Sequence, residues 1–473
     1  MSDSVSPSAS GGGLYRRVWR WHFFAGLICL PLIFSLAVTG ALYLFHRQID
    51  DLVYADPLLR ANAAPAPAWP SSALVRNALL SYPGHPKSLT LPDDLRHNVQ
   101  VDVISSKGVT LQVFVDPVSG AVAGALDESQ RLMTTIKHLH SLALVGEGGK
   151  AVIEIVAGWV VVLVLSGAYL WWPRGRRQGV LAIRAQASGR VWWRDLHAIC
   201  GAYAGAVLLF LALTGMPWSV FWGAQVNRWM SDHGLGVPDG MWRNVPKSTQ
   251  PAAELGPLPW NLEHQPVPAS DPAAADPHAE HKEAARRAHA GRRYSVLDNP
   301  AAIGVDEAVV TLRGIGLDAG YRLSLPRDER GVYSAIRTPG QLDGQRVVHL
   351  DQYSGKVLMD IGAARFGALG RVTEWGVSVH QGAEYGWPNL LLMLAGCLAT
   401  MLLCVSGVVM WWRRRPSGRL AAPARRDGDR LARGVVAIGA TAGVFFPLLG
   451  ASMLAVWLLD FLLSQFKYLN RKE

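Results

Sequence analysis

The sequence predicts an α-helical integral membrane protein that contains a duplicated two-helix unit plus a fifth helix, with two small α+β domains outside the membrane. Three observations support this class. Five apolar stretches are each long enough to cross a bilayer, whose hydrocarbon core of about 30 Å requires about 20 helical residues. Hydrophobic residues make up 50% of the chain and charged residues only 17%, a balance that favours a membrane protein. Four of these stretches also form two repeats around histidines.

The first and third apolar stretches repeat without a gap at an offset of 175 residues. Each opens with a histidine and a glycine and closes with a Thr-Gly pair. The matching positions are His22, Gly26, Thr39 and Gly40 in one stretch, and His197, Gly201, Thr214 and Gly215 in the other. A helix needs apolar residues to cross a membrane, so a histidine at a fixed position calls for another explanation.

The second and fourth stretches repeat at an offset of 240 residues. The matching positions are His140, Gly146, Ser166, Gly167, Trp171 and Trp172, and then His380, Gly386, Ser406, Gly407, Trp411 and Trp412. Internal duplication is common in membrane proteins, and neutral imidazole is a good metal ligand. The repeats therefore predict a cofactor held between helices.

We expect membrane-spanning helices over 18–45, 150–172, 195–222, 389–412 and 435–463. Arginines crowd the short segments between them, which is the positive-inside pattern of cytoplasmic loops. The expected cytoplasmic segments are 1–17, 173–193 and 413–434, and the external ones are 47–149, 223–388 and 464–473. The net charge of +10 does not indicate nucleic-acid binding, because the basic residues concentrate in these short loops. The first span is expected to be retained, since its repeat mate lies mid-chain and cannot be a signal peptide.

The two long external segments share one plan. Each has a helix followed by strands, over about 71–125 and 305–360, and the strands alternate partly between apolar and polar residues. Each also has a hairpin turn with Asp first and Gly last, at 116–120 and 351–355. Domains of this size are marginally stable alone, so we expect them to pack on each other or on the helix ends.

Two further features receive structural interpretations. The four cysteines all lie inside spans, which predicts packing residues rather than disulfides or a zinc site. The segment 246–293 is rich in Pro, Ala and charged residues and is expected to be a low-complexity insertion.

Three motifs of the chain are specific in combination. They are the H-x3-G…T-G helix start, the V-x-V-D-P-x-S-G-x-V turn at Val113–Val122 with a looser copy at His349–Val357, and the L-H…G…S-G-x-Y-L-W-W helix. Together they resemble the PepSY-associated transmembrane helix (PepSY-TM) family, which includes iron-regulated membrane proteins and ferrisiderophore reductases. The resemblance covers roughly 14–175 and 190–415 and makes the two external domains PepSY-like.

The resemblance implies a bacterial inner-membrane protein that carries b-type haem (heme b) on membrane histidines and reduces ferric siderophores. Some relatives carry a fused flavin reductase module. This chain has no G-x-G-x-x-G motif after a strand, so we do not expect direct reaction with NAD(P)H. The expected electron donor is a quinol or a separate reductase.

The depth of the histidines predicts their pairing. His22 and His197 begin outward-going helices, so they lie near the cytoplasmic face, while His140 and His380 precede inward-going helices and lie near the outer face. A parallel repeat implies a pseudo-two-fold axis along the membrane normal, across which symmetry mates face each other. We therefore expect two haems, one held by each symmetric pair.

Small residues fit this arrangement. Seventeen helical residues rise about 25 Å, so Gly40 and Gly215 reach the outer haem level, and Gly167 and Gly407 reach the inner one. His46 and His138 lack histidines at the matching repeat positions and are auxiliary candidates only.

Other charged residues are weaker candidates. Glu154 and Asp460 are acidic residues within spans, although both lie near a helix end. Arg131, Lys137 and Arg371 lie close in sequence to the outer histidines and could hold propionates or an anionic chelate. Two alternative functions remain open at this point: a non-enzymatic PepSY binding or regulatory protein, and a haem or metal permease.

Overall fold

The computed structural model describes residues 10–173, 182–184, 186, 188–237, 245–248, 250–272, 294–415 and 433–469. The chain forms two compact units. The helical unit comprises Met1–Leu44, Lys137–Val226 and Trp387–Glu473, and the sheet unit comprises Phe45–Ile136 and Asn227–Gly386.

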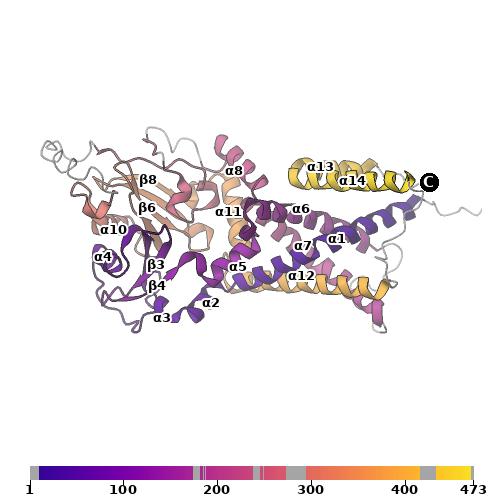
Figure 1. Cartoon of the computed structure of the whole chain (residues 1–473), viewed down its shortest axis with the longest axis horizontal. Helices are drawn as coiled ribbons and strands as arrows, with labels where there is room; N and C mark the ends of the chain where they lie inside the picture. Colours follow the sequence, from indigo (N-terminus) through magenta and orange to yellow (C-terminus); the bar gives the residue numbers. More distant parts are fainter. Residues whose placement is uncertain are drawn as a thin grey trace, which may run out of the picture. The chain divides into compact units, whose positions relative to one another are not determined.

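Four long helices form the main part of the helical unit (Figure 1). They are α1 (Ser10–Tyr43), α6 (Gly146–Trp171), α7 (Gly189–Gly215) and α12 (Trp387–Arg414). Among the described residues, these four helices are long and apolar enough to cross a membrane. Their outer surfaces are apolar too: Ile28 is 69% exposed and Leu398 is 55% exposed, which suits a helix surrounded by lipid.

The four helices form a bundle in which sequence mates lie diagonally. Helix α1 packs against α6 and α12, and α7 packs against the same two helices. The pair α1 and α7 therefore occupies one diagonal, and α6 and α12 occupy the other. Small residues let the backbones approach, as at Gly396, where a Cβ would lie 2.7 Å from Cγ1 of Val207.

The prediction of a single fifth helix over 435–463 is wrong. The chain there forms two helices, α13 (Arg433–Phe445) and α14 (Pro447–Leu469), which pack against each other (Figure 1). The reversal is tight, because a Cβ on Gly450 would lie 2.5 Å from the carbonyl oxygen of Gly443. Pro447 cannot donate a backbone hydrogen bond, which favours a helix start at this position.

This hairpin also affects the expected external tail, 464–473. That expectation required one crossing after residue 434, whereas the described helices reverse direction. The apolar part of α14, Pro447–Leu459, is shorter than the four spans. The hairpin is attached to α6, where Trp159 Nε1 donates to Ser452 Oγ at 3.0 Å and Leu449 packs against Gly158.

The two small α+β domains predicted from the sequence share one antiparallel sheet in the sheet unit. The first contributes β1 (Gly84–Leu91), β2 (Val99–Ser105), β3 (Thr110–Val115) and β4 (Val122–Asp127). The second contributes β5 (Tyr321–Ser324), β6 (Val332–Arg337), β7 (Arg346–Asp351) and β8 (Val357–Gly362). The strand order is β4-β3-β2-β1-β5-β6-β7-β8, and Leu89 of β1 lies opposite Leu323 of β5. Pairing of the two inner strands therefore joins two domains that are individually small.

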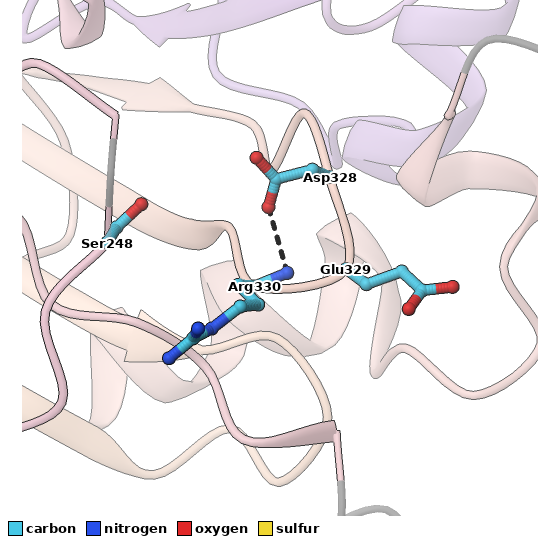
Figure 2. Close-up of a pocket in the computed structure, with 4 residues that line it drawn as sticks. All are labelled: Ser248, Asp328, Glu329 and Arg330. Carbon is cyan, nitrogen blue, oxygen red and sulfur yellow. Dashed lines mark hydrogen bonds between the residues drawn. The ribbon is translucent and has the colours of Figure 1, made fainter.

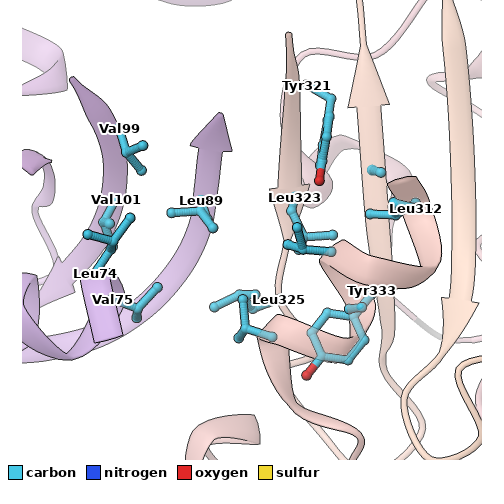
Figure 3. Packing of buried hydrophobic residues seen from close by; sticks show 14 of the residues in the cluster. Leu74, Val75, Leu89, Val99, Val101, Leu312, Tyr321, Leu323, Leu325 and Tyr333 are labelled. Atoms are coloured by element: carbon cyan, nitrogen blue, oxygen red, sulfur yellow. The ribbon is translucent and has the colours of Figure 1, made fainter. Parts of the chain in front are cut away.

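The core of the sheet unit joins both domains. Helices α4 (Ser71–Ser81) and α10 (Gly304–Gly314) contribute to the same buried cluster as the strands. Figure 3 shows Leu74 and Leu312 from these helices together with Leu89, Leu323 and Tyr333 from the strands. Alternate strand residues reach this core, as the partial alternation predicted.

The two Asp–Gly turns have the same geometry. Asp116 Oδ1 accepts the backbone N–H groups of residues 118 and 119, and Asp351 Oδ1 accepts those of residues 353 and 354. Gly120 has φ 72° and Gly355 has φ 69°, which favours glycine. The motif is therefore a hairpin turn with a structural role.

The insertion expected over 246–293 is only partly a loose segment. Leu255, Leu262 and Val267 are buried and pack with Val347 and Ile361 of the sheet. Apolar residues between the prolines supply this contact, which the overall composition did not indicate. Residues 249 and 273–293 lie outside the described residues.

Candidate functional site

His22 and His197 lie on the two diagonal helices α1 and α7 of the bundle. Their side chains are close enough to interact electrostatically. Helices α1 and α7 lie on one diagonal of the bundle, so this interaction links the two repeat mates across that diagonal. This arrangement brings together the inner pair that the repeats predicted.

A hydroxyl group binds each of these imidazoles. His22 Nδ1 lies 2.9 Å from Ser166 Oγ of α6, and His197 Nδ1 lies 2.9 Å from Ser406 Oγ of α12. The two serines occupy equivalent repeat positions, so one diagonal pair of helices supplies the histidines and the other supplies their hydrogen-bond partners.

A glycine follows each serine and faces the same imidazole. A Cβ on Gly167 would lie 3.3 Å from Cε1 of His22, and one on Gly407 would lie 3.8 Å from Cε1 of His197. The sequence predicted these glycines beside a macrocycle. In the structure they face the imidazole rings themselves, and only at Gly167 would a Cβ lie closer than an ordinary van der Waals contact.

The same contacts recur at the other end of the helices. His140, at the end of α5 (Leu132–His140), places Nδ1 2.9 Å from Thr39 Oγ1 of α1. A Cβ on Gly40 would lie 3.4 Å from Cε1 of His140 and 3.6 Å from Sγ of Cys397. Burial lowers the pKa of His140 below its ordinary value, which favours the neutral imidazole.

The remaining predicted site residues occupy other positions. His380 ends α11 (Ala368–His380) in the sheet unit, and Gly215 ends α7 in the helical unit. The pairing of His140 with His380 stays a prediction. His46 begins α2 (His46–Val53) and interacts electrostatically with Asp50 of that helix. His138 lies in α5, where its carbonyl faces the Ser141 hydroxyl.

Glu154 has a structural partner. It is buried, and its two carboxylate oxygens accept the backbone N–H groups of Phe221 and Trp222 at 2.8 and 3.1 Å. These groups lie at the start of α8 (Trp222–Asp232), where a carboxylate is favourable because the first N–H groups of a helix lack partners. The side chain of Asp460, the other acidic candidate, lies outside the described residues.

Of the three cations considered for an anionic ligand, Arg131 already binds within the sheet unit. It donates to Gln112 Oε1 at 2.8 Å and to Asp50 Oδ2 at 2.7 Å. Burial raises the pKa of Asp50, while Arg131 opposes the shift. Arg371 lies 3.9 Å from Asp343, and Lys137 is exposed.

Glu374 of α11 is a buried acid that sequence reasoning missed. Its Oε1 accepts the backbone N–H of Asn261 at 2.9 Å, and burial raises its pKa to about 7. Its partner lies far away in sequence, within the segment predicted to be loose. No local pattern could have indicated this contact.

One surface pocket of about 300 Å³ lies in the sheet unit, lined by Ser248, Asp328, Glu329 and Arg330 (Figure 2). Asp328 accepts the backbone N–H of Arg330 at 2.8 Å, so the pocket is built around a loop turn. Its lining combines both charges without a histidine, and it does not resemble the helical-unit arrangement.

The donor set of the helical unit suits a macrocycle-held metal better than a free ion. Among the described residues, no three His, Cys, Asp or Glu side chains converge as ligands for a metal ion. The two inner imidazoles are instead the kind of side chain that would hold a haem iron. The glycines beside the rings are compatible with such a group.

Two comparisons with known proteins complete this description. A family model described as the PepSY-associated TM region matches residues 19–414. This range includes the whole of α6, α7, α12 and the shared sheet, and α1 from residue 19 onward. A search of curated proteins found no match.

Proposed function

Since this chain belongs to the PepSY-associated transmembrane family, we propose that it is a haem-containing oxidoreductase that passes electrons across a bacterial inner membrane to a ferric siderophore. Residues 47–149 and 223–388 would then lie in the periplasm. The electron donor would be a quinol or a separate reductase.

The observation that supports this proposal most is the convergence of His22 and His197 from diagonal helices. Both would hold the iron of a b-type haem inside the bundle. Gly167 and Gly407 leave room for the imidazole rings, and the helices around them are apolar. When bound, the haem supplies a carrier that accepts and releases one electron.

A second haem is proposed for His140 and His380. The hydroxyl and glycine beside His140 match those of the inner histidines, which favours the same ligand role. Two haems at different depths would allow electrons to cross the bilayer without moving a charged side chain through hydrocarbon.

The proposed acceptor follows from iron chemistry. One electron converts a chelated Fe(III) into Fe(II), and the lower charge weakens its bonds to hard oxygen ligands. The protein would not need to open the chelate, because reduction itself favours release. An acceptor site is expected on the external PepSY-like domains.

The first test is a spectrum of the purified protein, oxidised and dithionite-reduced, together with the haem-to-protein ratio. We expect b-type bands and two haems per chain. A colourless protein after expression with sufficient haem would contradict the proposal and favour the non-enzymatic binding protein. Haem that exchanges between the two sides of a vesicle without redox change would favour a permease.

A second test addresses the acceptor. The protein is reduced without oxygen and mixed with ferric siderophores of different charge, with the iron-free siderophores as controls. Ferric siderophores should reoxidise the haems faster than the controls. Equal rates across several chelate classes would leave the haems as carriers for another acceptor.

A further inference from the structure

The serines beside the inner histidines already use their hydroxyl protons. Ser166 Oγ donates to the carbonyl oxygen of Leu163 at 3.2 Å, and Ser406 Oγ donates to that of Leu403 at 3.0 Å. A hydroxyl group has one proton to donate but can accept through its lone pairs. Each serine oxygen therefore meets its imidazole as an acceptor.

This use of the hydroxyl proton then determines which nitrogen of the imidazole is protonated. An acceptor 2.9 Å from Nδ1 requires a proton on Nδ1. A neutral imidazole carries only one N–H, so Nε2 is left with a free lone pair. The carbonyls of Leu163 and Leu403, which can only accept, also face His22 and His197, respectively.

A contact elsewhere in the helical unit supports this assignment. Ser452 Oγ donates to the carbonyl of Leu449 at 2.7 Å and accepts Trp159 Nε1 at 3.0 Å. An indole N–H can only donate. Here the direction of the hydrogen bond is unambiguous: a serine that donates to a carbonyl of its own helix accepts an aromatic N–H.

We infer that Ser166 and Ser406 are positioning residues that hold His22 and His197 in the Nδ1–H tautomer and thereby present Nε2 to the haem iron. This inference rests on the proposed function. Partners of the non-ligating nitrogen commonly fix the tautomer and orientation of a metal-binding histidine. A neutral hydroxyl partner does so without adding the negative charge that a carboxylate would bring.

Thr39 extends the inference to His140. Its Oγ1 donates to the Ser35 carbonyl at 2.6 Å and lies 2.9 Å from His140 Nδ1. Three hydroxyls, on α1, α6 and α12, therefore make the same contact, and each is followed by a glycine that faces the same imidazole. Ordinary helix packing does not require this combination three times.

The tautomer can be measured without haem. The full-length protein is expressed without added haem and labelled with ¹⁵N-histidine, and the imidazole nitrogens are assigned with His22→Gln and His197→Gln variants. We expect protonated Nδ1 and unprotonated Nε2 at both histidines. Protonated Nε2 in the wild type would overturn the inference.

The effect on the haem is measured with Ser166→Ala and Ser406→Ala. Loss of such a partner typically weakens metal binding about 10- to 100-fold, and we expect a comparable loss of haem affinity with a shifted midpoint potential and low-spin EPR signal. Ser166→Thr and Ser406→Thr keep the hydroxyl and should restore these properties. Ser452→Ala removes a matched hydroxyl whose aromatic partner is Trp159 and not a histidine, and it should change none of them.

These measurements separate two failures. If wild-type haem is bound and both alanine variants retain its affinity, potential and EPR signal, the positioning role is wrong while the proposed function stands. If the expected tautomer is present but the wild type binds no haem, the proposed function fails while the serine–histidine geometry stands.

Discussion

At the residue scale, the informative unit of this protein is a hydroxyl residue followed by glycine. The hydroxyl binds an imidazole nitrogen and the glycine admits the ring, at Ser166-Gly167 and Ser406-Gly407 alike. The sequence predicted the histidines and the glycines from their repeated positions. It could not predict which atoms meet, because side-chain contacts between helices depend on helix rotation.

The two inner glycines provide a graded test. Gly167→Ala should lower the inner haem content more than Gly407→Ala, because the added carbon would lie 3.3 Å from His22 in the first case and 3.8 Å from His197 in the second. Both changes favour the helix itself by about 1 kcal/mol. The haem-to-protein ratio and thermal unfolding of both variants, measured in the same detergent, provide the check. Equal haem loss would show that these contacts do not limit the site.

Glu374 should make the stability of the sheet unit depend on pH. Burial raises its pKa from 4.5 to about 7, so the folded state binds more protons than the unfolded state between these values. Stability should therefore be fully present below pH 4.5, fall as the pH rises toward 7 and then level off, a loss of roughly 3 kcal/mol. Thermal unfolding of the wild type and of Glu374→Gln measures this difference. The prediction fails if the two proteins show the same pH dependence over this window.

At the element scale, diagonal packing is the feature that supports the symmetric pairing of histidines. Helices α1 and α7 share the neighbours α6 and α12, as a parallel repeat about a central axis requires. Hydropathy and repeat spacing were sufficient to predict these four helices. They were insufficient for the α13–α14 hairpin, because an average over an apolar stretch does not register the tight contact between Gly443 and Gly450.

The pairing predicts how haem loss is distributed. His22→Ala and His197→Ala should each remove the same haem, and His140→Ala and His380→Ala should each remove the other. Redox titration with haem quantification distinguishes the two haems by potential. His233→Ala is the control, because this exposed histidine binds the Trp229 carbonyl in the sheet unit. Loss of one common haem in His22→Ala and His140→Ala would instead place ligation within a repeat.

At the scale of the whole molecule, the sequence predicted two kinds of structure and the chain has both. The family match and the four apolar helices support a membrane protein with a separate antiparallel sheet region. The sequence also predicted two related external domains. It predicted that they would pack on each other or on the helix ends, but not how. The shared sheet depends on which edge strands meet, and that choice involves residues more than 200 positions apart, such as Leu89 and Leu323.

Membrane topology is tested by labelling. Ser119→Cys and Ser354→Cys lie on exposed turns of the sheet unit and should react with an impermeant maleimide applied from outside. Ser188→Cys, in an expected cytoplasmic loop, should react only in inside-out vesicles. Most native cysteines are buried in the helices and provide a low background. The reverse labelling pattern would overturn the arginine-based orientation.

The meeting of β1 and β5 has a consequence for the ancestry of the chain. The two strands are antiparallel and equivalent in the repeats, with Leu89 opposite Leu323 near the local dyad. A primordial gene for one repeat would have produced a protein with β1 as an open edge, which a second identical copy could pair with to form a homodimer. Fusion of two such genes would convert an association between two molecules into one within a single chain. Accordingly, halves of this protein separated between α6 and α7 and co-expressed should reassemble. Each half alone should self-associate, which size-exclusion chromatography with light scattering can detect.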